Sequence, residues 1–182
     1  MSTEIIDAKR FNFQTILLVE DNEDDVFIMR STFRKTGIPN PLQVVPDGEA
    51  AIAYLRGDGV YSEPEKYPLP AILLLDLNMP KKNGLEVLQW VRSQPHLKRL
   101  TVHILTASTR TVDVQRAYEY GANCYLVKPS KIEALVEMVR SWHQLAQFSA
   151  FSALTSRSTT IPAAPHLWKD DLPVSPAGTA AA

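Results

Sequence analysis

Acidic, hydroxyl and amine side chains stand at the ends of short apolar runs in this sequence. Glu20 and Asp21 follow the first run, Asp76 follows the third, Thr106 follows the fourth, and Lys128 follows the fifth. Three carboxylates that are brought together repel one another unless a cation shares their site. If the folded chain gathers these residues, the sequence therefore predicts a site for a divalent cation beside a reactive carboxylate.

Mg2+ is the cation that suits these groups, because it prefers oxygen ligands and keeps several waters. A plausible ligand set is Asp21, Asp76 and the carbonyl of Asn78, with Glu20 acting through water. A lysine ammonium and a threonine hydroxyl are suited to phosphoryl oxygens. With Lys128 neutralising charge, the Asp76 carboxylate could attack a phosphoryl group in line and form an acyl phosphate.

The elements that must position these residues follow from the hydrophobic pattern. Short apolar runs alternate five times with helical patterns, which predicts a parallel sheet whose strands are buried on both faces. The predicted strands are residues 15–19, 42–45, 71–75, 102–105 and 124–127, and the predicted helices are residues 24–35, 49–56, 84–92, 112–120 and 132–146. Ligands of such sheets bind beyond the carboxyl ends of the strands, which is where the reactive residues fall.

Four segments of the chain resemble the motifs of the bacterial receiver domain of two-component response regulators. They are ILLVED at 16–21, LLLDLNMPKKNG at 73–84, ILTAS at 104–108 and YLVKP at 125–129. The resemblance implies an α/β, flavodoxin-like (CheY-like) doubly wound fold with five parallel strands in the order 2-1-3-4-5. PKKNG and NCYLVKPS are most similar to the small cyanobacterial regulators that are served by phytochrome histidine kinases.

The resemblance also implies a role for each matching residue. Glu20 and Asp21 become the acidic pair, Asp76 the phosphoacceptor, Asn78 the backbone Mg2+ ligand, Thr106 the switch hydroxyl, Lys128 the phosphoryl-binding lysine and Tyr125 the switch aromatic. The family has a cis peptide bond at the position of Lys128–Pro129. The implied partner is a histidine kinase, and the switching face, formed by the fourth helix, fifth strand and fifth helix, is a possible homodimer contact.

Composition limits the other functions and predicts the boundaries. The net charge of -1 over 182 residues gives no electrostatic basis for binding nucleic acid, and no apolar run is long enough to span a bilayer, so a cytoplasmic location is expected. We expect an N-terminal extension at 1–13, a receiver domain at 14–146 and a flexible Ser/Thr/Ala/Pro-rich tail at 147–182. Residues 57–70, with two glycines and three prolines, predict a surface loop.

Simpler and competing interpretations remain open. Asn22 or Asp21 could cap the first helix, with the acidic residues 23–25 favouring its positive end, and Tyr125 could be an ordinary strand residue. Cys124 is expected to be a buried packing residue. The four histidines lack a ligand-spaced pair, which argues against a zinc site.

The expected activity is self-phosphorylation and slow autodephosphorylation, not turnover of a substrate. A haloacid-dehalogenase-like Mg2+ phosphatase is the enzyme alternative, but its second aspartate is replaced by Asn78. A pseudo-receiver that binds partners without phosphorylation is the other alternative. The intact acidic pair, Thr106 and Lys128 argue against it.

Overall fold

Five parallel strands form one sheet in the order β2-β1-β3-β4-β5, which confirms the predicted topology. The computed structural model describes residues 14–155, and their side chains through residue 146. The strands are β1 (Ile16–Val19), β2 (Leu42–Val45), β3 (Ile72–Leu75), β4 (Thr101–Thr106) and β5 (Cys124–Val127). The helices are α2 (Glu23–Thr36), α3 (Gly48–Arg56), the short 3-10 helix η1 (Gly59–Tyr61), α4 (Gly84–Ser93), α5 (Thr111–Glu119) and α6 (Ile132–Thr155).

Strand burial follows position in the sheet. Every residue of β1 and β3 is buried, because these strands have neighbours on both edges and helices over both faces. The edge strand β5 is only partly covered, and the Val127 side chain is 40% exposed. Ile16 of β1 pairs with Leu42 of β2 on one side and with Ile72 of β3 on the other, so β1 lies between these two strands.

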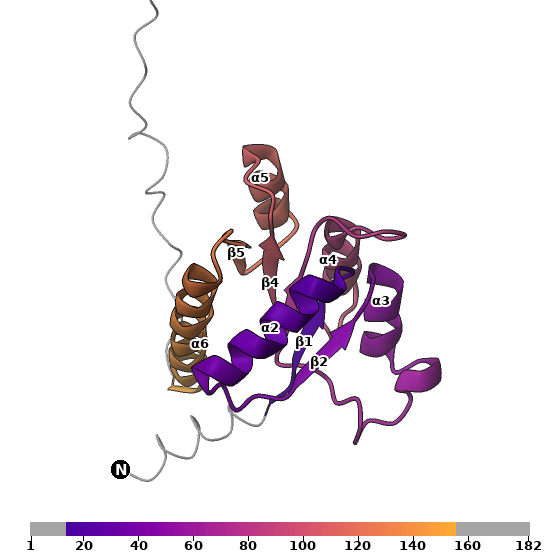
Figure 1. Ribbon diagram of the computed structural model, residues 1–182. Coiled ribbons are helices and arrows are strands. Elements are labelled where there is room, and N and C mark those ends of the chain that lie inside the picture. Colours follow the sequence, from indigo (N-terminus) through magenta and orange to yellow (C-terminus); the bar gives the residue numbers. More distant parts are fainter. Residues whose placement is uncertain (1–13, 156–182) are drawn as a thin grey trace, which may run out of the picture.

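Helices cover both faces of the sheet (Figure 1), and a hydrophobic core lies on each face. On one face, alternate strand residues such as Leu17 and Leu73 pack against α3, α4 and α5. On the other face, their neighbours such as Leu18 and Leu74 pack against α2 and α6, which also contact each other. This alternation is the two-residue period of a strand covered on both sides.

Capping interactions fix the helix that starts directly after the acidic pair. The side chain of Asn22 accepts hydrogen bonds from the backbone N–H groups of Asp24 and Asp25 at 2.9 and 3.1 Å, so Asn22 is the N-cap of α2. The helix ends at Thr36, and Gly37 follows it as the C-cap with φ 68°, a conformation that glycine adopts readily just beyond the last turn. The first turn of α2 is thereby held beside the end of β1.

The structure corrects two of the expectations. The last helix continues to Thr155, beyond the predicted end at 146, so the predicted boundary between domain and tail falls within this helix. No cis peptide bond occurs among the described residues, so Lys128–Pro129 lacks the cis bond that the resemblance implies. The extension at 1–13 and residues 156–182 lie outside the described residues. No helix within residues 14–155 is long and apolar enough to cross a membrane.

Candidate functional site

Two carboxylates meet at the carboxyl edge of the central strands. Glu20 follows β1 and Asp76 follows β3, and the backbone N–H of Asp76 donates to the carbonyl of Val19 at 3.1 Å. Both residues are buried, Glu20 at 3% exposure and Asp76 at 7%. Adjacent parallel strands thus bring two acidic residues that are far apart in the sequence to one place, as predicted.

Lys128 connects these carboxylates from the end of β5. Its Nζ donates to Glu20 Oε2 at 2.5 Å and to Asp76 Oδ2 at 2.8 Å. A third carboxylate, Asp25 in the first turn of α2, accepts from the same Nζ at 2.8 Å. The backbone N–H of Lys128 also donates to the carbonyl of Thr106 at 2.8 Å, which ties β5 to β4 at the site. One ammonium therefore holds three carboxylates from three elements.

Burial and ion pairing compete at this cluster. Burial raises the pKa of Glu20 above its ordinary value, although the Lys128 ammonium acts in the opposite direction. Burial alone would lower the pKa of Lys128, but hydrogen bonds to Asp25, Asp76 and Glu20 outweigh it and raise that pKa. Lys128 therefore stays protonated and is the positive charge that compensates the carboxylates.

The loop after Asp76 is packed closely around the reactive carboxylate. Asn78 is exposed, and its backbone N–H donates to Asp76 Oδ1 at 3.1 Å. Gly84, the first residue of α4, lies so close to this loop that an added Cβ would be 2.1 Å from the Asp76 carbonyl oxygen. Only glycine fits there without moving the backbone. The fold thus holds the Asp76 carboxylate and the Asn78 backbone together.

The other predicted metal ligand takes a different position. Asp21 is exposed and makes no hydrogen bond or ion pair with another described side chain. Within residues 14–146, no three Asp, Glu, His or Cys side chains are spaced as ligands of one metal ion. The chemistry of the cluster still suits Mg2+, since hard oxygen donors already converge on one positive charge and Mg2+ needs few protein ligands besides water.

The sequence interpretation missed Asp25 as a member of the cluster. The acidic run at 23–25 was assigned only to the positive end of the first helix. Asp25 lies on the side of the first turn of α2 that faces Lys128, where it remains 41% exposed. In the sequence, Asp25 lies one helical turn after the acidic pair, which could have indicated that it is near the cluster. The sequence does not show which side of the helix faces the edge of the sheet.

The predicted switch residues lie in neighbouring strands. Thr106 is fully buried at the end of β4, and its hydroxyl accepts a hydrogen bond from the Ser108 N–H at 3.3 Å. The Tyr125 hydroxyl donates to the Ser108 carbonyl at 3.0 Å, while the Ser108 hydroxyl donates to Asp113. Ser108 therefore connects the predicted switch threonine to the predicted switch tyrosine. Burial raises the pKa of Tyr125, so the phenol stays protonated as the donor.

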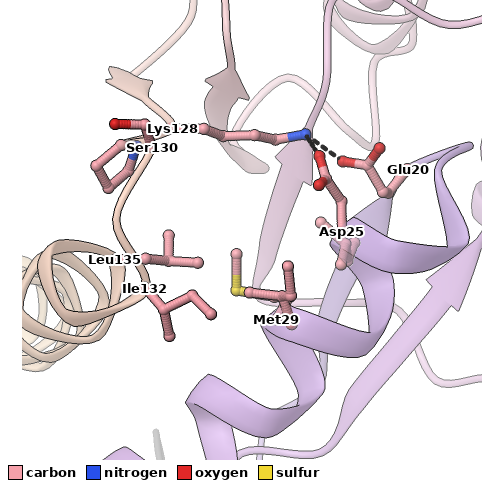
Figure 2. A pocket seen from close by; sticks show the side chains of 10 residues that line it. Glu20, Asp25, Met29, Lys128, Ser130, Ile132 and Leu135 are labelled. Carbon is pink, nitrogen blue, oxygen red and sulfur yellow. Dashed lines mark hydrogen bonds and ion pairs between the residues drawn. The ribbon is translucent and has the colours of Figure 1, made fainter.

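A pocket of about 230 Å³ opens beside the carboxylate cluster, between α2 and the start of α6. Figure 2 shows Lys128 reaching Asp25 and Glu20 at one side of this pocket, with apolar side chains such as Met29 and Leu135 on the other. The ammonium and carboxylates are therefore reachable from solvent next to an apolar surface.

Comparisons with known proteins agree with this geometry. Residues 16–140 match the family described as the response regulator receiver domain. The chain is 41% identical over 127 residues to the response regulator Rcp1 of Synechocystis sp., covering 70% of this chain and 84% of Rcp1.

Solved structures show the same similarity. The phosphorylated cyanobacterial phytochrome response regulator RcpA superposes with a TM-score of 0.68 at 35% identity, covering 73% of this chain and 93% of RcpA. The Mn(2+)-bound form of Rcp1 gives a TM-score of 0.67 at 37% identity, covering 82% of this chain and 99% of Rcp1. The chain belongs to the response regulator receiver domain family and is a receiver-domain response regulator of two-component signalling.

Proposed function

We propose that Asp76 is the residue through which this regulator receives its signal, by accepting a phosphoryl group from a histidine kinase. The observation that carries the proposal is the contact of Lys128 Nζ with Asp76 Oδ2 at 2.8 Å, at the open carboxyl edge of the sheet. Receiver domains of this family are phosphorylated by histidine kinases. The similarity to the cyanobacterial phytochrome response regulator RcpA supports a phytochrome-type kinase as the partner.

In this reaction a carboxylate oxygen of Asp76 attacks the phosphorus atom of phosphohistidine. The new P–O bond forms as the P–N bond breaks, and the imidazole leaves with the electron pair. Lys128 compensates charge on the phosphoryl oxygens, and the Thr106 hydroxyl, at the end of the neighbouring strand β4, is the candidate donor to one of them. Bound Mg2+ supplies further charge neutralisation, with Glu20, Asp21, Asp76 and the Asn78 carbonyl as its candidate ligands.

The chain then acts as a switch and not as an enzyme with its own substrate. Phosphorylation draws Thr106 toward the phosphoryl group, which changes the loop that Ser108 shares with Tyr125. The affected surface is formed by α5, β5 and α6, and it is the proposed contact for a second copy of the chain. Size-exclusion chromatography with light scattering, with and without beryllofluoride and Mg2+, tests this step; an unchanged mass would contradict switching by dimerisation.

Phosphorylation of the full chain tests the central claim. Wild type incubated with acetyl phosphate and Mg2+ should gain one phosphoryl group by intact mass, and hydroxylamine should remove it as expected for an acyl phosphate. Asp76→Asn should gain none, while Asp58→Asn, which changes an exposed aspartate elsewhere, should react as wild type. Lys128→Met should slow the reaction by about a hundredfold.

Two results would overturn the assignment. A phosphoryl group on Asp76→Asn at the wild-type level would place the acceptor elsewhere. Failure of wild type to react with either acetyl phosphate or a phosphorylated kinase would favour a receiver that works without phosphorylation. Turnover of a small phosphate ester by wild type but not by Asp76→Asn would instead identify a phosphatase.

A further inference from the structure

An ion pair outside the carboxylate cluster joins α3 to the loop that carries Asp76. Lys81 Nζ lies 2.5 Å from Asp47 Oδ2. Asp47 directly precedes α3, and Lys81 lies between β3 and α4. The Asp47 side chain is 8% exposed, whereas that of Lys81 is 55% exposed. A buried carboxylate is thus satisfied by a lysine that reaches it from the phosphoacceptor loop.

A hydrogen bond at the start of α3 fixes the orientation of the Asp47 carboxylate. Its Oδ1 accepts the backbone N–H of Ala50 at 2.8 Å and caps α3, which leaves Oδ2 for Lys81. Burial tends to raise the pKa of Asp47, but the hydrogen bonds from Lys81 and Ala50 outweigh it and lower that pKa. The carboxylate is therefore ionised and fixed in direction.

The loop lies directly on the first turn of α3. A Cβ added to Gly48 would be 2.4 Å from the Lys82 carbonyl oxygen and 2.7 Å from the side chain of Val87. Glycine at this position lets the two backbones touch. Asp47 and Gly48 together form the surface on which the middle of the loop rests.

The loop backbone is unusual at Lys81. Lys81 has φ 65° and is the one non-glycine residue with positive φ among those described. This conformation is unfavourable for a residue with a Cβ, and glycine or asparagine takes it more readily. Lysine adopts a positive φ less readily than glycine or asparagine does, but its side chain can reach Asp47 Oδ2. The residue type is thus explained by the ion pair and not by the turn.

We propose that the Asp47–Lys81 ion pair is a positioning latch, which holds residues 77–81 so that the Asn78 backbone and the Asp76 carboxylate are arranged to bind a divalent cation. The inference rests on the proposed function of Asp76. Neither Asp47 nor Lys81 touches the reacting atoms, so both are positioning residues. They act on Asn78 through the three peptide units that separate it from Lys81 and through the packing of the loop on Gly48.

Calorimetric titration of the full chain with Mg2+ tests the latch without any phosphoryl transfer. Asp47→Asn keeps an oxygen for the Ala50 N–H but loses the charge, and Lys81→Met loses the ammonium. Each should weaken Mg2+ binding by about tenfold, as is usual for groups that orient metal ligands. The double variant should be no weaker than either single one, because both remove the same interaction. Lys81→Arg should restore binding.

Matched controls separate positioning from stability. Lys82→Met changes the adjacent lysine, which has no ion pair with another described residue, and should bind Mg2+ as wild type. Lys81→Gly favours the positive φ and should keep the unfolding free energy of wild type, yet it should still weaken Mg2+ binding. With acetyl phosphate, the half-saturating Mg2+ concentration should rise in the latch variants while the rate at saturating Mg2+ stays within about twofold of wild type.

Unchanged Mg2+ affinity in Asp47→Asn and Lys81→Gly would overturn the latch, as would fully additive losses in the double variant. These outcomes are distinct from failure of the proposed function. If Asp76 is not the phosphoacceptor, wild type does not become phosphorylated there, and the calorimetric comparison of the variants still decides whether the latch governs cation binding.

Discussion

Lowering the pH from 7 to 5 is expected to reduce the free energy of unfolding by about 2 kcal/mol through a single residue, His103. His103 lies in β4, and its Nδ1 accepts a hydrogen bond from Trp142 Nε1 at 2.5 Å. The two rings meet edge to face with centroids 5.8 Å apart, beneath α6. Burial lowers the pKa of His103 from 6.5 to about 4.

The sign of the effect follows from where protons bind. The unfolded chain protonates this histidine below pH 6.5, while the folded chain resists protonation until about pH 4. The unfolded state therefore takes up protons first, and stability that is present above pH 6.5 is lost as the pH falls toward 4. Each unit of pKa difference corresponds to about 1.4 kcal/mol, which sets the full loss at about 3.5 kcal/mol and the loss at pH 5 at about 2 kcal/mol.

Urea unfolding between pH 7.5 and 4.5 measures this effect as a difference between variants. His103→Asn keeps an acceptor for the Trp142 indole but cannot titrate, so its stability should fall less steeply with pH than that of wild type. His96→Asn, at an exposed histidine, serves as the matched control and should follow the wild-type slope. Parallel curves for wild type and His103→Asn would refute the reasoning, since other titrating groups are common to both proteins.

Three substitutions test other contacts that stabilise the fold, by the same urea unfolding assay at neutral pH. Gly84→Ala should cost about 1 to 3 kcal/mol, because its Cβ would collide with the Asp76 carbonyl; wild-type stability would contradict that close packing. Asn22→Ala should cost about 1 kcal/mol through loss of the α2 cap, and Asn22→Ser should recover most of it. Arg92→Met should cost about 2 kcal/mol, because its guanidinium binds backbone carbonyls of two loops, whereas exposed Arg99→Met should cost little.

The strand order and much of the site were predictable because they depend on patterns that are local in the sequence. Apolar runs such as 72–75 identify buried parallel strands, and polar residues directly after them must share one edge of the sheet. Glu20, Asp76 and Lys128 are in contact for this reason. Their chemical roles remain predictions, but their proximity follows from topology alone.

Features that depend on packing between distant segments were not predictable. Asp25 joins the cluster because of the rotation of α2 about its axis, which the acidic run at 23–25 does not reveal. The loop at 57–70 was expected at the surface, but its Tyr61 and Tyr67 rings pack on each other and on Tyr54 of α3. These aromatic contacts arise only once the chain has turned back on itself.

The histidines show the same limit. Their spacing could not show that His103 accepts a hydrogen bond from Trp142, since one residue lies in β4 and the other in α6. The end of α6 was also misplaced, because the Ser, Thr and Ala content after 146 was given more weight than the helical spacing of Phe148, Phe151 and Leu154.

The pairing of β1 with a strand on each of its edges has a consequence for synthesis of the chain on the ribosome. β1 emerges before both of its partners, which begin at Leu42 and Ile72, so one of its edges stays unpaired until β3 has been translated. Contacts between residues so far apart in the chain form slowly, because a long loop must close first. A nascent chain that stalls before Ile72 would present an apolar strand edge to chaperones or to other nascent chains.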